Sequence, residues 1–275
     1  MTKVKICGLT RSADIEAVNQ ARPDYVGFVF AKSIRQIGPA QAAVLKSLLD
    51  ETIESVGVFV DAPLELPVSL YAAGTIDIAQ LHGDEDEAYI MALKEKCDIP
   101  IIKAVKVRVP SVKAQGDSAV RTPRMGISGN RANEGSGVEN PDKGFAAMDL
   151  ADYLLLDSGG GSGLPFDWSL IDATRMAGKR WFLAGGLDIG NLPDALRVNP
   201  WGVDVSSGVE TGGVKDYEKI QAFVRSVRLA QGVGAESVPI RGPIPTPMKM
   251  DVGKTVSKRT TGITDKTTDE RGVNR

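Results

Sequence analysis

The stretch VKICGLTRSADIEAVNQARPDYVGFVF, residues 4–30, contains two short apolar runs separated by a helix-like segment. The runs VKICG (4–8) and YVGFVF (25–30) are rich in β-branched and aromatic residues and are bounded by glycine or charge, as strands are. The segment RSADIEAVNQA (11–21) between them predicts a helix. A strand, a helix and a second strand in this order indicate an α/β protein with a parallel sheet.

The same alternation continues along most of the chain. Further helices are predicted at GPAQAAVLKSLLD (38–50), DEDEAYIMALKEK (84–96) and DYEKIQAFVRSVRLA (216–230). Six further runs predict strands: SVGVFV (55–60), IDIAQLHG (76–83), IPIIKAVKV (99–107), YLLLDS (153–158), WFLAGG (181–186) and GVDVSSG (202–208). Eight strands alternating with helices over about 230 residues indicate a (β/α)8 TIM barrel. A doubly wound open sheet is the alternative, because alternation alone does not prove that the sheet closes.

Two regions do not fit the alternation. Residues 108–144 are polar and rich in glycine and serine, so we expect an inserted loop between the fifth and sixth strands. A short helix is predicted near KGFAAMDLA (143–151). Residues 232–275 contain too few apolar residues to pack and predict a disordered tail. The expected domain is therefore a barrel over residues 1–231, followed by that tail.

Composition narrows the class of protein and its partners. The chain has 275 residues and a net charge of -2, which gives no indication of nucleic acid or an anionic membrane as a partner. It contains no apolar run long enough to span a bilayer and no signal peptide core. The two cysteines, Cys7 and Cys97, do not make a disulfide framework, so the cytoplasm is the expected compartment. The oligomeric state is not encoded in any pattern of the sequence.

Two loops near the end of the chain predict a phosphate site. In a TIM barrel the site lies at the C-terminal ends of the strands, and phosphate often binds after the seventh and eighth strands. LAGGL (183–187) and DVSSGVE (204–210) follow those strands and offer backbone N–H groups and hydroxyls. One Gly-Gly pair alone favours an ordinary tight turn, since glycine is the usual turn residue, but two such loops after consecutive strands favour phosphate binding. The predicted ligands are Gly185, Gly186, Ser206, Ser207 and Gly208.

Asp157 ends the run LLLD, and strand alternation puts it on the same face as Leu155. An aspartate at this position could instead cap the next helix. The glycines that follow favour a loop first, and they allow a ligand to approach the backbone closely. They are Gly159, Gly160, Gly161 and Gly163.

Lys5 and Cys7 share one face of the first strand, and we expect that face to line the barrel interior. Barrel closure would set the last strand beside the first, which allows an ion pair between Lys5 and Asp204. A nearby ammonium favours a thiolate and would lower the pKa of Cys7. The alternative for a lone cysteine is an inert buried thiol.

His82, the only histidine, lies with Gln80 on one face at the end of the fourth strand. Nothing near it in the sequence has the spacing of metal ligands, so no metal site is expected. We interpret His82 as a residue that lines the site or supports it.

Seven motifs, in the same order, resemble those of the phosphoribosylanthranilate isomerase family. They are KICGLTR, GFVF followed by SIR, GVFVD, QLHGDE, LLLDSGGGSGLPFDW, LAGGL and GVDVSSGVETGGVKD. The resemblance runs from residue 3 to about residue 228, apart from the expected insertion. It implies a TIM barrel that isomerises a small phosphoribosyl substrate in tryptophan biosynthesis without a metal or organic cofactor.

The resemblance also implies roles for individual residues. Cys7 would be the general base, Asp157 the general acid, and Arg35 the ligand of the anthranilate carboxylate. We expect His82 and Asp204 to contact the substrate as well. Asp157 would have to be protonated to act as an acid, so its pKa should be raised by partial burial and by the substrate phosphate.

Two positions depart from the family pattern. Ile34 stands where the family's SPR motif has proline, and Gly212 replaces the proline of its PGxKD motif, which should loosen that turn. Other phosphosugar barrels remain alternatives, namely indoleglycerol-phosphate synthase and ribulose-phosphate 3-epimerase, although a single histidine disfavours the epimerase. A non-catalytic barrel that binds phosphorylated ligands is the alternative from another class, and retention of Cys7 and Asp157 argues against it.

Overall fold

The computed structural model describes residues 1–108, 126–127, 143–157 and 178–232. The chain divides into two units, Met1–Ala235 and Glu236–Arg275, and every described residue belongs to the first. Most of the expected insertion, the glycines after Asp157 and almost all of the expected tail lie outside the described residues. The expected domain boundary at residue 231 therefore stays a prediction.

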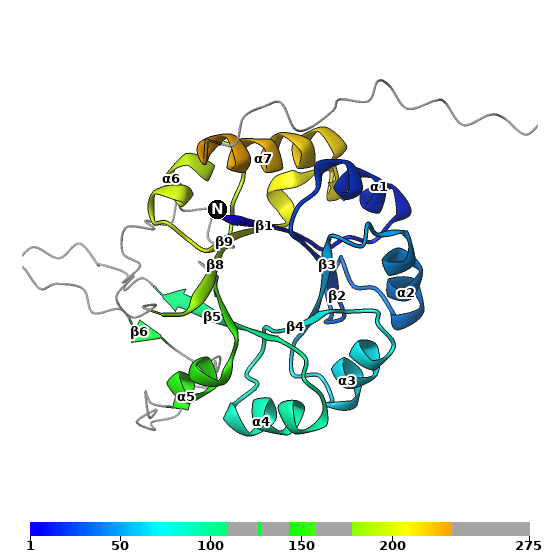
Figure 1. The fold of residues 1–275 in the computed structure, drawn as a ribbon, viewed down its shortest axis with the longest axis vertical. Helices are drawn as coiled ribbons and strands as arrows, with labels where there is room; N and C mark the ends of the chain where they lie inside the picture. The colour runs from blue at the N-terminus through cyan, green and yellow to red at the C-terminus, as the bar shows by residue number, and fades with distance from the viewer. Residues whose placement is uncertain (109–125, 128–142, 158–177, 233–275) are drawn as a thin grey trace, which may run out of the picture. The chain divides into compact units, whose positions relative to one another are not determined.

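Eight parallel strands form a closed ring (Figure 1). Neighbouring strands pair in the order β1-β2-β3-β4-β5-β7-β8-β9, and β9 pairs again with β1. The strands are β1 (Lys3–Cys7), β2 (Tyr25–Val29), β3 (Glu54–Phe59), β4 (Ile78–Leu81), β5 (Ile101–Arg108), β7 (Tyr153–Asp157), β8 (Arg180–Ala184) and β9 (Gly202–Val205). The predicted TIM barrel is confirmed, and the open sheet is excluded because the ring has no free edge.

Helices surround this ring on its outer side (Figure 1). Five of them occur within a few residues of their predicted bounds: α1 (Ser12–Ala21), α2 (Pro39–Leu48), α4 (Glu87–Lys96), α5 (Lys143–Leu150) and α7 (Tyr217–Ala230). The sequence did not indicate α3 (Glu65–Ala72) or α6 (Leu192–Arg197). Each of these is short and contains a proline, Pro67 in α3 and Pro193 in α6, which weakens the sequence pattern of a helix.

Three short elements lie outside the regular alternation. β6 (Gly126–Ile127), within the expected insertion, pairs antiparallel with the end of β5. After β9 the chain makes a 3-10 turn, η3 (Ser207–Val209), and then a hairpin of β10 (Glu210–Thr211) and β11 (Val214–Lys215).

The hairpin turn contradicts the expected loosening at Gly212. Gly212 and Gly213 form its two-residue turn with φ values of 60° and 79°. Positive φ at both positions is what a tight type I′ hairpin requires, and proline cannot adopt it. The glycine therefore permits a tight turn here.

Two apolar layers lie on opposite sides of the strands. Val4 and Ile6 belong to the larger layer, between the strands and the helices. The smaller layer fills the barrel interior with Tyr25, Val56, Ile78, Ile102, Leu155, Phe182 and Ala184. The predicted inward direction of the face that carries Lys5 is confirmed, and Leu155 points into the interior as well. No helix in the described part of the chain is long and apolar enough to cross a bilayer.

Candidate active site

The interior of the barrel contains a buried ion pair between Lys5 and Asp204. The two residues are directly opposite in the β1–β9 pairing, and Lys5 Nζ donates to Asp204 Oδ2 at 3.0 Å. Lys5 has no exposed surface and Asp204 has 9%. Burial alone would lower the pKa of Lys5, but the charges of Asp204 and Cys7 outweigh it and raise that pKa. The hypothesis of a Lys5–Asp204 pair is confirmed, whereas a contact of Asp204 with substrate stays a prediction.

Cys7 ends β1 just above this pair and is 9% exposed. Burial is the largest effect on its thiol and raises its pKa, while the positive charges of Lys5 and Lys215 lower it in part. The expectation of a net lowered pKa was therefore wrong. The influence of Lys5 has the predicted sign, but removing the thiol from water has the larger effect.

Asp157 lies across the mouth of the barrel, at the end of β7, and is joined to His82. Gln80 Nε2 donates to His82 Nδ1 at 2.8 Å, so the neutral ring carries its proton on Nε2. His82 Nε2 lies 3.3 Å from Asp157 Oδ2. The side chains of His82 and Asp157 are 26% and 22% exposed. This geometry makes His82 the residue that orients the candidate acid.

The two predicted phosphate loops lie against each other. Gly185 and Gly186 follow β8 with positive φ values of 89° and 64°. A Cβ on Gly208 would come within 1.9 Å of Leu187 O, so only glycine allows this approach of the loops. The first N–H groups of η3 have no partner within the turn, and no side chain of the described residues caps them. Phosphate binding by these loops stays a prediction.

The Ser206 hydroxyl makes contacts within the protein, and phosphate binding by Ser206 stays a prediction. Its Oγ donates to Cys7 O at 3.0 Å and lies 3.4 Å from Lys215 Nζ. This hydroxyl connects the end of β9 to the end of β1. Ser207, by contrast, is exposed at the start of η3.

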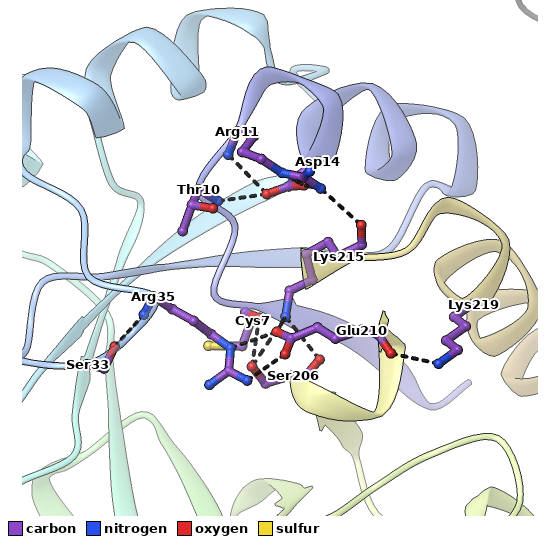
Figure 2. Close-up of polar contacts among 10 residues, drawn as sticks. All are labelled: Cys7, Thr10, Arg11, Asp14, Ser33, Arg35, Ser206, Glu210, Lys215 and Lys219. Atoms are coloured by element: carbon purple, nitrogen blue, oxygen red, sulfur yellow. Dashed lines mark hydrogen bonds and ion pairs between the residues drawn. The ribbon is translucent and has the colours of Figure 1, made fainter. Parts of the chain in front are cut away.

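Arg35 is held by a carboxylate of the protein. Its Nε and Nη2 donate to Glu210 Oε1 and Oε2, both at 2.7 Å, in a bidentate pair (Figure 2). Lys215 Nζ donates to the same carboxylate. Burial would raise the pKa of Glu210, but hydrogen bonds from Arg35 and Lys215 lower it to about 2. Nη1 is the one nitrogen of the guanidinium for which the described residues supply no acceptor.

The sequence analysis gave no role to Glu210, Lys215 or Gln80. A signal for the first two was present, since both are charged residues within the small and apolar stretch GVETGGVKD that follows the last strand. For Gln80 the shared strand face with His82 was recognised, but the hydrogen bond was not. Among the described residues, no group of three His, Cys, Asp or Glu side chains could hold a metal ion.

Known proteins resemble the chain over most of its length. An N-(5'-phosphoribosyl)anthranilate isomerase of Endomicrobium trichonymphae is 42% identical over 234 residues, which is 83% of this chain and 99% of that protein. The crystal structure of the phosphoribosyl anthranilate isomerase of Thermotoga maritima matches with a TM-score of 0.63 and 32% identity, over 84% of this chain and 100% of that one. Another crystal structure of such an isomerase, in complex with reduced 1-(o-carboxyphenylamino)-1-deoxyribulose 5-phosphate, matches with a TM-score of 0.61 and 31% identity over the same shares.

The closed barrel, with a cysteine and an aspartate on different strands at one mouth, defines a (β/α)8 protein with a candidate acid–base site. A sequence model of the family described as N-(5'-phosphoribosyl)anthranilate (PRA) isomerase matches residues 4–123 and 132–226. The chain belongs to the phosphoribosylanthranilate isomerase family.

Proposed function

We propose that this chain catalyses the Amadori rearrangement of N-(5-phosphoribosyl)anthranilate to 1-(2-carboxyphenylamino)-1-deoxyribulose 5-phosphate in tryptophan biosynthesis. The observation that carries the proposal is the placement of Cys7 and Asp157 at the C-terminal ends of β1 and β7. On one side only β8 and β9 separate these strands, and on the other side lie β2 to β5. A sugar between the two side chains would meet an acid on one side and a base on the other. The cytoplasm stays the expected compartment.

Asp157 would act first, in its protonated form. It gives its proton to the furanose ring oxygen, the bond between that oxygen and C1 breaks, and a Schiff base forms between C1 and the anthranilate nitrogen. The hydrogen bond to His82 supports this role because it fixes one carboxyl oxygen and thereby the direction of the group.

Cys7 would act second, as a thiolate. It removes the proton from C2, and the electron pair forms the C1–C2 double bond of an enolamine. The enolamine then takes a proton at C1 and loses the hydroxyl proton at C2, which gives the ketone. At this point Asp157 is a carboxylate and Cys7 a thiol. The thiol loses a proton and the carboxylate gains one as the enolamine tautomerises, directly or through solvent, so both groups return to their starting states.

The substrate's two anionic groups would bind to different loops of the mouth. The turn η3 after β9 would offer its first N–H groups to the phosphate, and the loop after β8 lies against it. Arg35 Nη1 would bind the anthranilate carboxylate, while Glu210 keeps the other two nitrogens. This arrangement allows the guanidinium to be fixed before the substrate arrives, which reduces the entropy lost on binding.

The test is a fluorescence assay of freshly generated phosphoribosylanthranilate with the wild type and Cys7→Ala in parallel. Because the substrate also decays to anthranilate, the product must be followed directly. We expect isomerisation by the wild type and none by Cys7→Ala, with binding of a reduced product analogue retained in both. A fully active Cys7→Ala would remove the proposed mechanism. Binding without isomerisation by either protein would favour the non-catalytic phosphosugar-binding barrel.

A further inference from the structure

Lys215 is a buried lysine with no part in the chemistry described above. Its side chain is 2% exposed, and that of Glu210 opposite it is 6% exposed. Lys215 Nζ donates to Ser206 O at 3.0 Å and to Glu210 Oε1, and it lies 3.4 Å from Ser206 Oγ. These acceptors occupy the three hydrogens of the ammonium, so it is held in one position.

The position of Lys215 is coupled to the position of Cys7. Ser206, which accepts from Lys215, donates through its Oγ to Cys7 O. Arg35 approaches from the other side, where a Cβ on Gly8 would come within 2.4 Å of Arg35 Cδ. Figure 2 shows the Cys7 thiol among Arg35, Ser206 and the Glu210–Lys215 pair.

The charged groups around Cys7 are unequal in number. Lys5 and Asp204 form one pair and cancel. Glu210 is a single anion shared by two cations, Arg35 and Lys215, so this second group has one positive charge in surplus. The surplus lies on the side of the hairpin, and its effect on a poorly solvated thiol is large because little water screens it.

We propose that Lys215 is a positioning residue for the base, whose ammonium favours the thiolate of Cys7, and that Glu210 limits this effect by neutralising part of the charge. The inference rests on the proposed function, since only a base requires Cys7 as thiolate. It agrees with the electrostatics of the thiol, because burial raises the pKa of Cys7 while Lys5 and Lys215 lower it in part. Glu210 thus interacts with both cations. It holds Arg35 in position for the substrate carboxylate, and it reduces the effect of the Lys215 charge on Cys7.

The experiment titrates the Cys7 thiolate by its ultraviolet absorbance in full-length protein carrying Cys97→Ala. The spectrum of the matching Cys7→Ala protein is subtracted to remove the tyrosines. We expect Lys215→Met to lower the thiolate fraction at a fixed pH about tenfold, and Glu210→Gln to raise it. Lys215→Arg keeps the charge and should stay near the parent. The pH profile of turnover should move in the same two directions.

Lys219 provides the matched control. Its Nζ also bonds Glu210, at the backbone oxygen and 2.6 Å away, but it is exposed and lies beyond Glu210 as seen from Cys7 (Figure 2). Lys219→Met should therefore leave the Cys7 titration unchanged. A fall in the thiolate fraction as large as that of Lys215→Met would overturn the inference. The double variant Lys215→Met/Glu210→Gln removes one charge of each sign, so it should titrate near the parent even where the single variant folds poorly.

A lower Cys7 thiolate fraction in Lys215→Met and a higher one in Glu210→Gln support the inference. General damage to the site would change the thiolate fraction of both variants in the same direction. Changes in the same direction, or none, overturn the inference. The titration needs no turnover, so its result is separable from the proposed function. The parent protein could fail to isomerise the substrate while Lys215→Met and Glu210→Gln still change the thiolate fraction in opposite directions. That result would refute the proposed reaction and still support the effect of Lys215 and Glu210 on Cys7.

Discussion

The two halves of the candidate site use different physical means to prepare their reactive groups. Cys7 lies in a buried network of ion pairs, with Lys5–Asp204 beneath it and Arg35–Glu210–Lys215 beside it. Asp157 lies in a partly exposed position at the end of β7, where one of its contacts is a hydrogen bond with His82.

This difference corresponds to the opposite protonation states that the two roles require. A buried thiol resists ionisation, so a base built on it needs positive charge nearby. A carboxyl that must hold a proton needs the reverse, namely neutral neighbours that orient it without strongly stabilising its anion. The expected rise in the pKa of Asp157 stays a prediction, and the comparison makes it testable.

The largest expected effect is on the acid side. Asp157→Asn keeps the shape of the side chain but removes its proton donor, so kcat should fall about 10²- to 10⁴-fold. His82→Asn, which removes only the orienting ring, should cost about tenfold. Steady-state rates of product formation measure both. A loss below tenfold for Asp157→Asn would mean that another group is the acid.

The second effect is on stability and concerns the base side. Lys5→Met leaves the buried carboxylate of Asp204 without a partner and should lower the free energy of unfolding by about 3–5 kcal/mol. The double variant Lys5→Met/Asp204→Leu should recover most of this loss, since it removes both charges. Urea denaturation gives the values.

The matched change on the acid side is Gln80→Leu. Gln80 is 1% exposed, its Nε2 bonds His82, and its Oε1 is buried without a partner in the described part of the chain. Because a neutral bond is lost together with an unpaired polar atom, the cost should stay near 1 kcal/mol. Equal losses for Lys5→Met and Gln80→Leu would contradict the view that the buried Lys5–Asp204 ion pair contributes more to stability than the hydrogen bond of Gln80.

The third effect depends on pH. The folded protein holds the pKa of Glu210 at about 2, below the value near 4.3 of a free glutamate. A depressed pKa stabilises the fold above pH 4.3 or so, and this contribution disappears as the pH falls toward 2. The wild type should therefore lose about 2 kcal/mol more than Glu210→Gln across that window, with screening by solvent taken into account. Parallel unfolding curves at all pH values would show that the carboxylate is not ion-paired in solution.

Local patterns in the sequence predicted the strands and the direction of their side chains. Period-two alternation placed Lys5 inside the barrel, and barrel closure placed Lys5 beside Asp204. Each of these inferences needs only a strand and its neighbour. The short helices α3 and α6 were missed because each contains a proline, Pro67 or Pro193, which weakens the sequence pattern of a helix.

The contacts within the site could not be predicted in the same way. Arg35 and Glu210 are 175 residues apart, and His82 and Asp157 are 75 residues apart. Their meeting depends on how loops fold over the mouth, which no local period encodes. The net effect on the Cys7 thiol was also misjudged, because the degree of burial is a property of the whole barrel and not of the strand that carries the residue.

The smallest effect concerns the turn that holds Lys215 opposite Glu210. Gly212 has φ 60°, and a Cβ there would meet no atom within 4 Å, so a substitution acts through backbone conformation alone. Gly212→Ala should cost about 1 kcal/mol, and Gly212→Asn less, because asparagine tolerates positive φ.

Gly212→Pro restores the residue of the family motif but cannot adopt this φ, so it should cost more than alanine and disturb the Glu210–Lys215 pairing. On the base side this would appear twice, as a lower unfolding free energy and as a smaller thiolate fraction of Cys7. Gly212→Ala and Gly212→Asn keep the turn, so they should lower the unfolding free energy and leave the thiolate fraction of Cys7 unchanged. A proline variant with an unchanged Cys7 titration would show that the hairpin is not needed to hold the ammonium in place, and that Ser206 and Glu210 suffice.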